Sequence, residues 1–595
     1  MTRTPLRPLA RILDVRAKGG DPDQVESENL RARNDQMRDK ARTRAESRLL
    51  VLGAFFLVAF SAIGLKMGAI ASSEPREPIA YSGSTIQQQR ADIVDRNGRI
   101  LATNLQTYSL YAQPHLMVDP VKAAAGLVEI FPELNYDRLI KDFTGSRKFL
   151  WIRKKISPEQ MQQVHDIGEP GLYFGPREMR LYPNGNLAAH ILGGASFGEE
   201  GVHAAEIVGV AGVEKAFDSF LRDPAEKGRP LELSIDLSVQ TAVHEVLSGG
   251  MMLMDAKGAM SIIMDVHTGE VISMVSLPDF DPNNRPPPPV KGSPADSPIF
   301  NRAVQGLYEL GSAFKPFTVA KAIEQGLVNE NSIIDTKGPM IWGRFRIRDF
   351  DDYGATMSVS KIIEKSSNIG TARIALMLGA NRLEAFMREI GLLDPSPIEL
   401  VEAPYVRPLV PKTWSDISLM TISYGHGVST SPINLAAAYA TVFGGGTVVK
   451  PTLLKRTKVE PGPRVLPARL SQQMSDMVRR VVTQGTASLA EVPGYSVGGK
   501  TGTADKPKET GGGYHKDKVI ATFAGVFPTN APRYVIIVTL DEPSTYIAGM
   551  NRRTAGWTAA PVAGEMVRRI APLLGLRPEI ASAGLSKVTE VASRQ

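Results

Sequence analysis

The chain has 595 residues, of which 43% are hydrophobic, 7% aromatic and 22% charged, a composition typical of two or more globular domains and not of a disordered chain. The formal net charge is +7, but residues 1–48 hold 12 Lys/Arg against 8 Asp/Glu and the remainder 57 against 54, so no basic groove for nucleic acid is indicated. The absence of cysteine excludes disulfides, thiolate metal sites and a cysteine nucleophile.

An apolar run from Leu49 to Leu65 follows a basic segment, residues 31–48, that carries seven Lys/Arg. The run is at the short end for a membrane-spanning helix, and Lys66 can snorkel so that the span continues towards Ala71. A cleaved signal peptide has its charges at the extreme N-terminus and a shorter apolar core, so the pattern favours an uncleaved anchor. Positive-inside asymmetry then places residues 1–48 in the cytoplasm and everything from about residue 72 outside. The basic arm is interpreted as a topology signal, with a cytoplasmic partner contact as the alternative.

Beyond a polar linker over residues 72–89, residues 90–102 predict two strands joined by an Asn-Gly turn. The pattern to about residue 230 is mixed and shows no cluster of nucleophiles or metal ligands. We expect this segment to be structural support. A short strand over 231–235 and a helix through Val239 to Val246 follow it.

The rest of the chain predicts strands on either side of a helical middle, which indicates an α+β fold with one sheet covered by helices. The expected elements are strands at 259–266, 271–277, 519–527 and 534–540, and helices within 358–392, 431–443 and 557–574.

A serine three residues before a lysine, Ser312 and Lys315, begins another predicted helix, which ends at Gly326. Pro316 fits the first turn of this helix, where its missing N–H costs nothing. Positions three apart share a helix face, so the Lys315 amine can reach the Ser312 hydroxyl. Burial or a neighbouring cation lowers the pKa of a lysine, and the neutral amine can then activate a serine nucleophile.

Two further short motifs accompany this pair: Ser366-Ser367-Asn368, where a predicted helix is interrupted, and Lys500-Thr501-Gly502-Thr503 after a glycine pair. The combination S-x-x-K, S-x-N and K-T-G is known from penicillin-binding proteins and class A β-lactamases. In acyl transfer Ser312 would attack and Lys315 would accept its proton. Ser366 would relay a proton, Asn368 would hold the substrate amide, and Lys500 would supply positive charge.

The third motif would bind the substrate. The Thr501 and Thr503 hydroxyls suit a terminal carboxylate, and an exposed strand from Lys500 through Gly502 to Thr503 can pair with an extended peptide. The backbone N–H groups of Ser312 and Thr503 are the expected oxyanion donors.

Two competing patterns carry less weight. The segment from Gly494 to Thr501 matches the phosphate-binding loop G-x-x-x-x-G-K-T, but prolines and glycines around it leave no room for the helix that such a loop must open. His426, between Gly425 and Gly427, is interpreted as a turn residue and not a base, because Lys315 already fills that role.

In these motifs the sequence resembles the class B penicillin-binding proteins, and among them the septal, FtsI-type peptidoglycan transpeptidases. The likeness runs from the anchor to about residue 575. It includes the following segments: Ile93-Val94-Asp95-Arg96-Asn97-Gly98, Gly212-Val213-Glu214, Val266-His267-Thr268-Gly269-Glu270-Val271, Trp414-Ser415-Asp416 and Ser423-Tyr424-Gly425-His426-Gly427. One departure is Leu310, where the family usually has proline before Gly-Ser.

The resemblance implies a single-pass anchor, an elongated mixed α/β pedestal, and a transpeptidase domain with an antiparallel sheet, helices on both sides and an all-helical subregion. The domains expected are a cytoplasmic tail 1–48, an anchor 49–71, a dimerisation-type pedestal 72–230, a transpeptidase domain 231–575 and a tail 576–595. Site residues would be Ser312, Lys315, Ser366, Asn368 and Lys500 for catalysis, and Thr501, Gly502 and Thr503 for substrate.

The implied reaction is attack of the serine on the D-Ala-D-Ala end of a peptidoglycan stem peptide, release of D-Ala, and transfer of the acyl group to another stem's amine. β-Lactams would acylate the same serine. We expect neither a cofactor nor a metal nor nucleic acid, a location in the inner membrane with a periplasmic catalytic domain, and partners in division, notably an FtsW-type glycosyltransferase. Three alternatives stay open: an elongation-type transpeptidase, a scaffold or β-lactam sensor on the same fold, and a carboxypeptidase that transfers to water.

Overall fold

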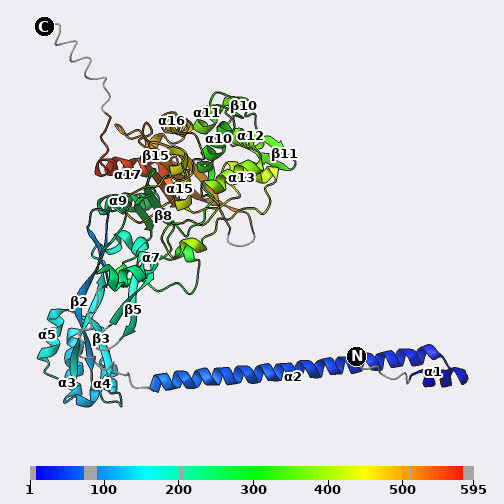
Figure 1. The fold of residues 1–595 in the computed structure, drawn as a ribbon, viewed down its shortest axis with the longest axis vertical. Coiled ribbons are helices and arrows are strands. Elements are labelled where there is room, and N and C mark those ends of the chain that lie inside the picture. The colour runs from blue at the N-terminus through cyan, green and yellow to red at the C-terminus, as the bar shows by residue number, and fades with distance from the viewer. Residues whose placement is uncertain (1–7, 73–89, 201–204, 509–511, 580–595) are drawn as a thin grey trace, which may run out of the picture. The chain divides into compact units, whose positions relative to one another are not determined.

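The computed structural model describes residues 8–72, 90–200, 205–508 and 512–579 of the chain. It separates into two compact units, an N-terminal one up to Ser82 and a larger one from Gly83 onward (Figure 1). The predicted linker at 72–89 falls almost wholly outside the described residues.

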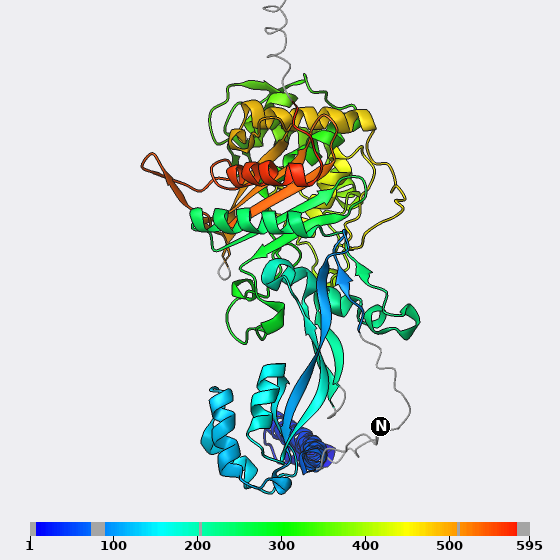
Figure 2. The ribbon, with the colours of Figure 1, turned by 90° about the vertical axis from the view of Figure 1, so that its left-hand side faces the viewer.

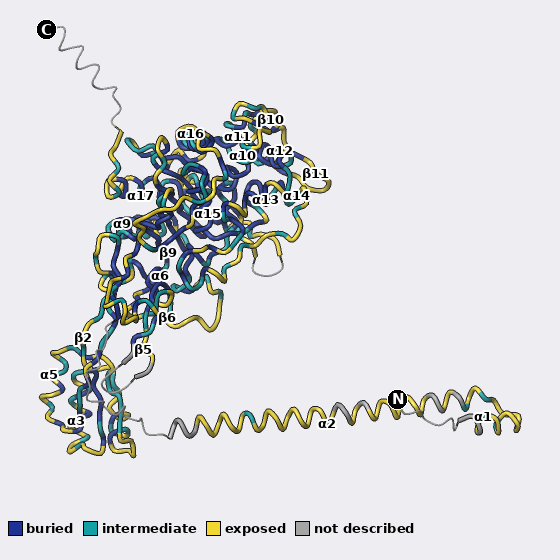
Figure 3. Tube along the Cα trace, viewed as in Figure 1, coloured by how far each residue is buried: buried dark blue, intermediate teal, exposed yellow. Residues whose placement is uncertain are grey.

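Two helices make up the N-terminal unit, α1 (Pro8–Ala17) and α2 (Pro22–Ser72). Within α2, Arg48–Met67 is long and apolar enough to cross a membrane, and it is the one such helix among the described residues. The large apolar side chains of this segment are exposed (Figure 3). A helix satisfies its own backbone hydrogen bonds, so an exposed apolar helix suits a lipid environment. The expected apolar span is therefore confirmed as one continuous helix.

The larger unit opens with the predicted hairpin. Strand β1 pairs antiparallel with β2, so that Ile93 lies opposite Ala102 across the Asn-Gly turn. Gly98 has φ +80°, a conformation that glycine adopts without Cβ strain. The hairpin is confirmed, and β2 continues to pair with β3 and β4. The strands of this first sheet are β1 (Ile93–Val94), β2 (Ile100–Ala112), β3 (Leu150–Ile156), β4 (Leu172–Leu181) and β7 (Leu231–Glu232).

Three helices enclose a separate apolar core beside this sheet. Each begins at a polar residue whose side chain accepts a hydrogen bond from a helical backbone N–H: Asp119, Asn135 and Ser157. The core joins Leu110 of β2 to Phe131 and neighbouring side chains of the helices. The helices are α3 (Pro120–Ile130), α4 (Tyr136–Phe143) and α5 (Pro158–Asp166).

A strand ribbon and short helices connect this region to the rest of the unit. They are α6 (Ala189–Leu192), β5 (Gly194–Glu200), β6 (Ala205–Ala211), α7 (Gly212–Ala216) and α8 (Asp218–Arg222).

The second half of the unit is built on a five-stranded antiparallel sheet in the order β14-β15-β16-β8-β9. Strand β16 lies in the middle and every one of its residues is buried, which is why its sequence reads as a nearly continuous apolar run. The predicted strands are confirmed. Their bounds are β8 (Gly258–Asp265), β9 (Val271–Leu277), β14 (Gly498–Pro507), β15 (Tyr514–Phe527) and β16 (Tyr534–Asp541).

Helices cover both faces of this sheet (Figures 1 and 2). On one face α9 (Leu237–Leu253) packs against α17 (Ala559–Leu573), and on the other lie α15 (Pro432–Phe443) and α16 (Ala468–Gln484). All twelve residues of α15 are buried, so that helix has no polar face. The expected α+β fold with helices on both sides is confirmed.

A mostly helical subregion carries the candidate nucleophile. The predicted helical stretch 358–392 forms three helices, and short two-stranded hairpins precede them. Its helices are α10 (Lys315–Glu324), α11 (Val359–Lys365), α12 (Asn368–Leu378), α13 (Ala380–Glu389) and α14 (Asp416–Ser423). The hairpin strands are β10 (Ile333–Asp335), β11 (Met340–Trp342), β12 (Phe345–Ile347) and β13 (Thr356–Ser358).

One more hairpin follows β16 in the chain and projects away from the rest of the unit (Figure 2). It consists of β17 (Thr545–Ile547) and β18 (Met550–Arg552).

Candidate active site

A short turn holds the candidate nucleophile at the start of α10. Residues Gly311–Phe314 form a 3-10 turn that passes directly into the α-helix, and Pro316 stands in its first turn as predicted. The surrounding residues 313–320 are buried, whereas Ser312 is partly exposed. The hydroxyl of Ser312 is therefore the polar group of this buried turn that a substrate can reach.

Two glycines allow the turn to lie against strand β14. Gly311 has φ +56°, and a Cβ there would stand 2.9 Å from the carbonyl oxygen of Thr503. A Cβ on Gly502 would stand 2.0 Å from the carbonyl oxygen of Leu310. Larger residues are excluded at both positions because the two backbones touch. This contact brings the segments of the two expected oxyanion donors, Ser312 and Thr503, side by side.

The second motif occupies a sharp turn between helices α11 and α12. Ser366 ends α11 with φ 67°, a left-handed conformation that a residue with a Cβ adopts only when the surroundings impose it. Ser367 then caps α12 by accepting a hydrogen bond from the Gly370 N–H. Ser366 and Asn368 stay partly exposed on either side of the buried Ser367. The predicted interruption of the helix is confirmed.

The two lysines converge on one serine. Lys315 Nζ donates to Ser366 Oγ at 3.0 Å, to Asn368 Oδ1 at 2.7 Å and to the Ser366 backbone oxygen. Lys500 Nζ donates to the same Ser366 Oγ at 2.9 Å and to the Thr501 backbone oxygen at 3.1 Å. Lys315, Ser366 and Lys500, one residue from each of three motifs that are far apart in the sequence, therefore meet at one hydroxyl.

Burial changes the proton affinity of both amines. Both lysine side chains are fully buried, at 0% exposure. Desolvation and, second, the positive charge of Lys500 hold the pKa of Lys315 well below its usual value, and the charge of Asp349 opposes this only in part. Desolvation lowers the pKa of Lys500 to about 7. A neutral amine is accordingly accessible at Lys315 near neutral pH, and its lone pair can accept a proton.

Asp349 is a residue that the sequence analysis missed. Its carboxylate accepts hydrogen bonds from Ser367 Oγ at 2.6 Å, from the Asn368 N–H at 2.5 Å and from the Ile369 N–H at 3.0 Å. It therefore caps the start of α12 and fixes the turn that carries Ser366. No local pattern predicts it, because the cap comes from a loop 18 to 20 residues upstream.

The third motif lies on β14, an edge strand of the sheet. The expectation of an exposed strand is wrong for most of the motif: Lys500, Thr501 and Gly502 are buried and Thr503 is partly exposed, because the backbone at Leu310 packs directly against Gly502. The Thr501 hydroxyl is 2.7 Å from that of Thr486, and Thr503 Oγ1 accepts a hydrogen bond from the Ala555 N–H at 3.0 Å. Because Thr503 only accepts there, its O–H proton remains available to an incoming anion.

Both competing patterns are resolved by the structure. The Gly-Lys-Thr segment lies in strand β14 and opens no helix, as the sequence predicted. His426 follows the end of α14 in a turn where Gly425 and Gly427 have positive φ. Its Nδ1 is 3.4 Å from Glu309 Oε2, so it contacts the approach to the nucleophile and not the lysine pair.

The sequence matches two families over most of its length. Residues 85–228 match the Penicillin-binding Protein dimerisation domain, and residues 259–567 match the Penicillin binding protein transpeptidase domain. The second match alone spans more than half of the chain.

Individual relatives agree with these matches. The chain is 34% identical over 556 residues, 91% of each protein, to the probable peptidoglycan D,D-transpeptidase FtsI of Caulobacter vibrioides. It is 28% identical to the peptidoglycan D,D-transpeptidase FtsI of Escherichia coli K12, covering 84% of this chain and 86% of that one.

A solved structure has the same fold. Penicillin binding protein 3 of Mycobacterium tuberculosis, determined with aztreonam, superposes with a TM-score of 0.62 at 24% identity, over 83% of this chain and 97% of the other. Together with the family matches and the Caulobacter relative, this settles the family to which the fold and its three motifs belong. The chain is a member of the class B penicillin-binding proteins, with a dimerisation domain ahead of a transpeptidase domain.

Proposed function

We propose that this chain is a peptidoglycan D,D-transpeptidase that cross-links stem peptides during cell division and is acylated by β-lactams at Ser312. The observation that carries the proposal is the Ser366 hydroxyl shared by two buried lysines, one of which follows the partly exposed Ser312 by three residues at the start of α10. Acyl transfer from a peptide needs a nucleophile, a base and a proton path to the leaving amine, and this arrangement offers all three. The relatives named D,D-transpeptidases support the substrate class.

Acylation begins with neutral Lys315. As Ser312 Oγ bonds to the carbonyl carbon of the penultimate D-Ala, Lys315 Nζ accepts the hydroxyl proton. The backbone N–H groups of Ser312 and Thr503 donate to the oxyanion that forms. The C–N bond then breaks with its electron pair moving to nitrogen, and a proton passes from Lys315 through Ser366 Oγ to the departing D-Ala amine. The product is an ester between Ser312 and the stem peptide.

Transfer reverses the proton path. The amine of a second stem attacks the ester carbonyl and loses its proton through Ser366 and Lys315. The new amide forms, the ester C–O bond breaks, and the proton returns to Ser312 Oγ. Because Ser366 Oγ accepts hydrogen bonds from both lysines, its own proton is free to point to the substrate nitrogen.

Substrate contacts follow from the edge strand. We assign Thr501, Gly502 and Thr503 to the donor stem peptide, which would extend the sheet beside β14 and direct its terminal carboxylate to the threonine hydroxyls and Lys500. Asn368 would bind the stem's amide. In the free protein its Nδ2 donates to the Arg348 carbonyl at 2.9 Å, a bond that substrate would replace or share.

The cellular placement is part of the same proposal. The basic arm supports a cytoplasmic N-terminus, an anchor in the inner membrane and a periplasmic catalytic domain. An FtsW-type glycosyltransferase and other division proteins would be its partners. The domains would be the tail 1–48, the anchor 49–71, the pedestal 72–230, the transpeptidase domain 231–575 and the C-terminal tail 576–595.

The decisive experiment labels the full-length, detergent-solubilised chain with a fluorescent penicillin. We expect the wild type to be labelled, Ser312→Ala to lose the label completely, and Ser293→Ala, a partly exposed serine without a capping hydrogen bond, to label as the wild type does. An unlabelled but folded wild type, or equal labelling of Ser312→Ala, would overturn the catalytic assignment in favour of a scaffold.

A second assay identifies the acceptor. The wild-type protein that reacts with penicillin is incubated with a donor peptide ending in D-Ala-D-Ala, with and without an amine acceptor. Release of D-Ala with a cross-linked product supports the transpeptidase, and release with hydrolysis alone would make the chain a carboxypeptidase. Penicillin labelling without any turnover would indicate a β-lactam sensor.

A depletion experiment in growing cells tests the septal role. Filamentous cells after depletion support a role in division, and rounded cells would indicate a role in elongation.

A further inference from the structure

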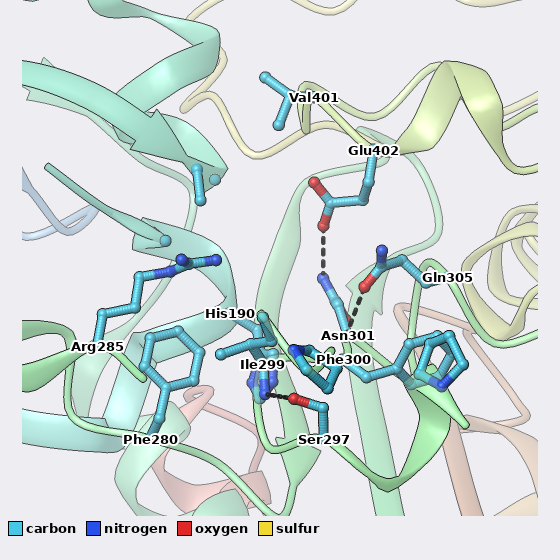
Figure 4. Close-up of a pocket in the computed structure, with 15 residues that line it drawn as sticks. His190, Phe280, Arg285, Ser297, Ile299, Phe300, Asn301, Gln305, Val401 and Glu402 are labelled. Carbon is cyan, nitrogen blue, oxygen red and sulfur yellow. Dashed lines mark hydrogen bonds between the residues drawn. The ribbon is translucent and has the colours of Figure 1, made fainter. Parts of the chain in front are cut away.

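A pocket that opens to solvent lies in the same unit, in a part of the structure built from none of the three motifs. Its volume is about 260 Å³. Its walls come from the α6–α7 region, from the loop between β9 and the nucleophile, and from the loop that contains Glu402 (Figure 4). This volume is below the range of about 300–1,000 Å³ that drug-sized ligands occupy, so it suits a molecule of amino-acid or dipeptide size.

The floor of the pocket is fixed by neutral contacts. His190 is 8% exposed, its Nε2 bonds to the Pro298 carbonyl at 2.8 Å, and its ring meets Phe280 edge to face at 5.3 Å. Burial lowers the pKa of His190 to about 4, so the ring carries no charge at neutral pH. Gly193 and Gly212 close another wall, where a Cβ on Gly193 would stand 2.2 Å from the backbone of Ala211. The pocket is therefore preformed.

Two opposite charges face each other across this space. Arg285 and Glu402 extend into the pocket from opposite walls (Figure 4). Arg285 lies over the Phe280 ring at 5.7 Å, yet its buried Nε has no hydrogen-bond partner, and within the described residues no carboxylate forms an ion pair with it. Glu402 accepts hydrogen bonds from Asn301 Nδ2 at 3.2 Å and from its own backbone N–H. Asn301 is 2% exposed, and its Oδ1 has no partner.

Holding two partly buried charges without a counter-charge in contact is unfavourable. Burial lowers the pKa of Arg285 and raises the pKa of Glu402, and in each case the charge of the other group opposes the shift. The two charges therefore sense each other without touching. A simple anion would be attracted by Arg285 but repelled by Glu402. A simple cation would be attracted by Glu402 but repelled by Arg285. A molecule that carries both charges completes both sides.

We infer that this pocket binds a small zwitterion, an α-amino acid or a dipeptide, with its carboxylate on the Arg285 guanidinium and its ammonium on the Glu402 carboxylate. The planar guanidinium can donate two parallel hydrogen bonds to a carboxylate, and the free acceptor of Asn301 lies beside Glu402. The inference does not depend on the proposed reaction, because none of these residues belongs to the lysine and serine cluster.

Binding is tested by the thermal shift and calorimetry of the full-length chain in detergent. The catalytic cleft is blocked with a penicillin beforehand, and measurements with and without that block separate the two sites. The probes are glycine, D-alanine, L-alanine and D-alanyl-D-alanine, with propionate and ethylamine as molecules that carry only one of the two charges. We expect at least one zwitterion to bind the blocked protein at least tenfold more tightly than either single-charge probe.

Variants then locate the site. Arg285→Met and Glu402→Gln should each weaken the zwitterion at least tenfold, and Arg285→Lys should weaken it as well because an ammonium lacks the planar fork. Arg344→Met is the matched control, since Arg344 also lies over an aromatic ring, Phe345 at 5.3 Å, but is exposed and outside the pocket. All variants should retain penicillin labelling, which shows that they fold.

Three results would overturn the inference. They are wild-type binding no tighter than that of the single-charge probes, binding that disappears once the catalytic cleft is blocked, and unchanged affinity in Arg285→Met and Glu402→Gln.

Discussion

The larger unit contains two clusters of buried charged side chains, which differ in whether their hydrogen-bond partners carry the opposite charge. In the dimerisation domain Glu214, at 0% exposure, accepts from Arg90 Nε at 2.7 Å and from Arg180 Nε at 2.6 Å, and Asp218 accepts from Arg90 at 2.7 Å. In the catalytic centre Lys315 and Lys500 share only neutral acceptors. Opposite charges hold a geometry, whereas burial and, second, a like charge lower the pKa of Lys315 and make it a base.

The largest effect is expected from removing that base. Lys315→Ala leaves Ser312 in place but takes away its proton acceptor, and general-base catalysis of this kind contributes on the order of 10²–10⁴-fold. We expect the second-order rate constant for acylation of the folded protein by a chromogenic β-lactam to fall by that factor. A loss of less than tenfold would show that Lys315 is not the base.

In the cluster of Glu214, Arg90 and Arg180, removal of a charge should lower the stability of the fold and leave the acylation rate unchanged. Glu214→Gln leaves the Arg90 and Arg180 guanidiniums buried without their counter-charge, which costs about 3–5 kcal/mol of folding free energy. Denaturant unfolding measures the loss, and acylation of the folded fraction should proceed at the wild-type rate. Glu226→Gln is the control, because Glu226 pairs with Arg229 near the surface at 2.8 Å and such a pair contributes about 0–1 kcal/mol. Equal effects of the two substitutions would contradict the comparison.

Asp349 should affect both stability and rate, since it is a carboxylate that positions a catalytic turn. Asp349→Asn weakens the cap of α12, and we expect a loss of about 1 kcal/mol in stability and a lower acylation rate. Its negative charge raises the pKa of Lys315, so its removal should also move the acidic limb of the rate profile to lower pH. A purely structural defect would lower the rate without moving the limb. Asp351→Asn, an exposed neighbour, should change neither.

The sequence predicted the elements that local patterns encode. The Asn97-Gly98 hairpin, the apolar strand β16 and the interruption at Ser366 were all visible because turn residues, apolar runs and breakers act within a few positions. The three motifs predicted that Ser366, Lys315 and Lys500 belong together. The roles of these residues remain proposals.

What the sequence did not contain were contacts made by distant parts of the chain. Asp349 caps a helix from another loop, and Arg90 meets Glu214 across more than a hundred residues. Arg285 and Glu402 likewise face one another only after folding. A single charged residue in a loop has the same local pattern whether it becomes solvated, paired or buried, so its partner cannot be predicted without the fold.

The most direct test of the account is the pH dependence of β-lactam acylation in the wild type and in Lys500→Met. Below the pKa of Lys315 the amine is protonated and cannot accept the Ser312 proton, so the rate should rise through a midpoint well below 10.5 and then level off. Lys500→Met removes a cation that helps to lower this pKa, so its midpoint should move to higher pH, whereas Lys500→Arg should keep it near the wild-type position. A wild-type midpoint near 10.5, or a midpoint that does not move in Lys500→Met, would contradict the claim that burial together with the neighbouring Lys500 charge makes Lys315 a base.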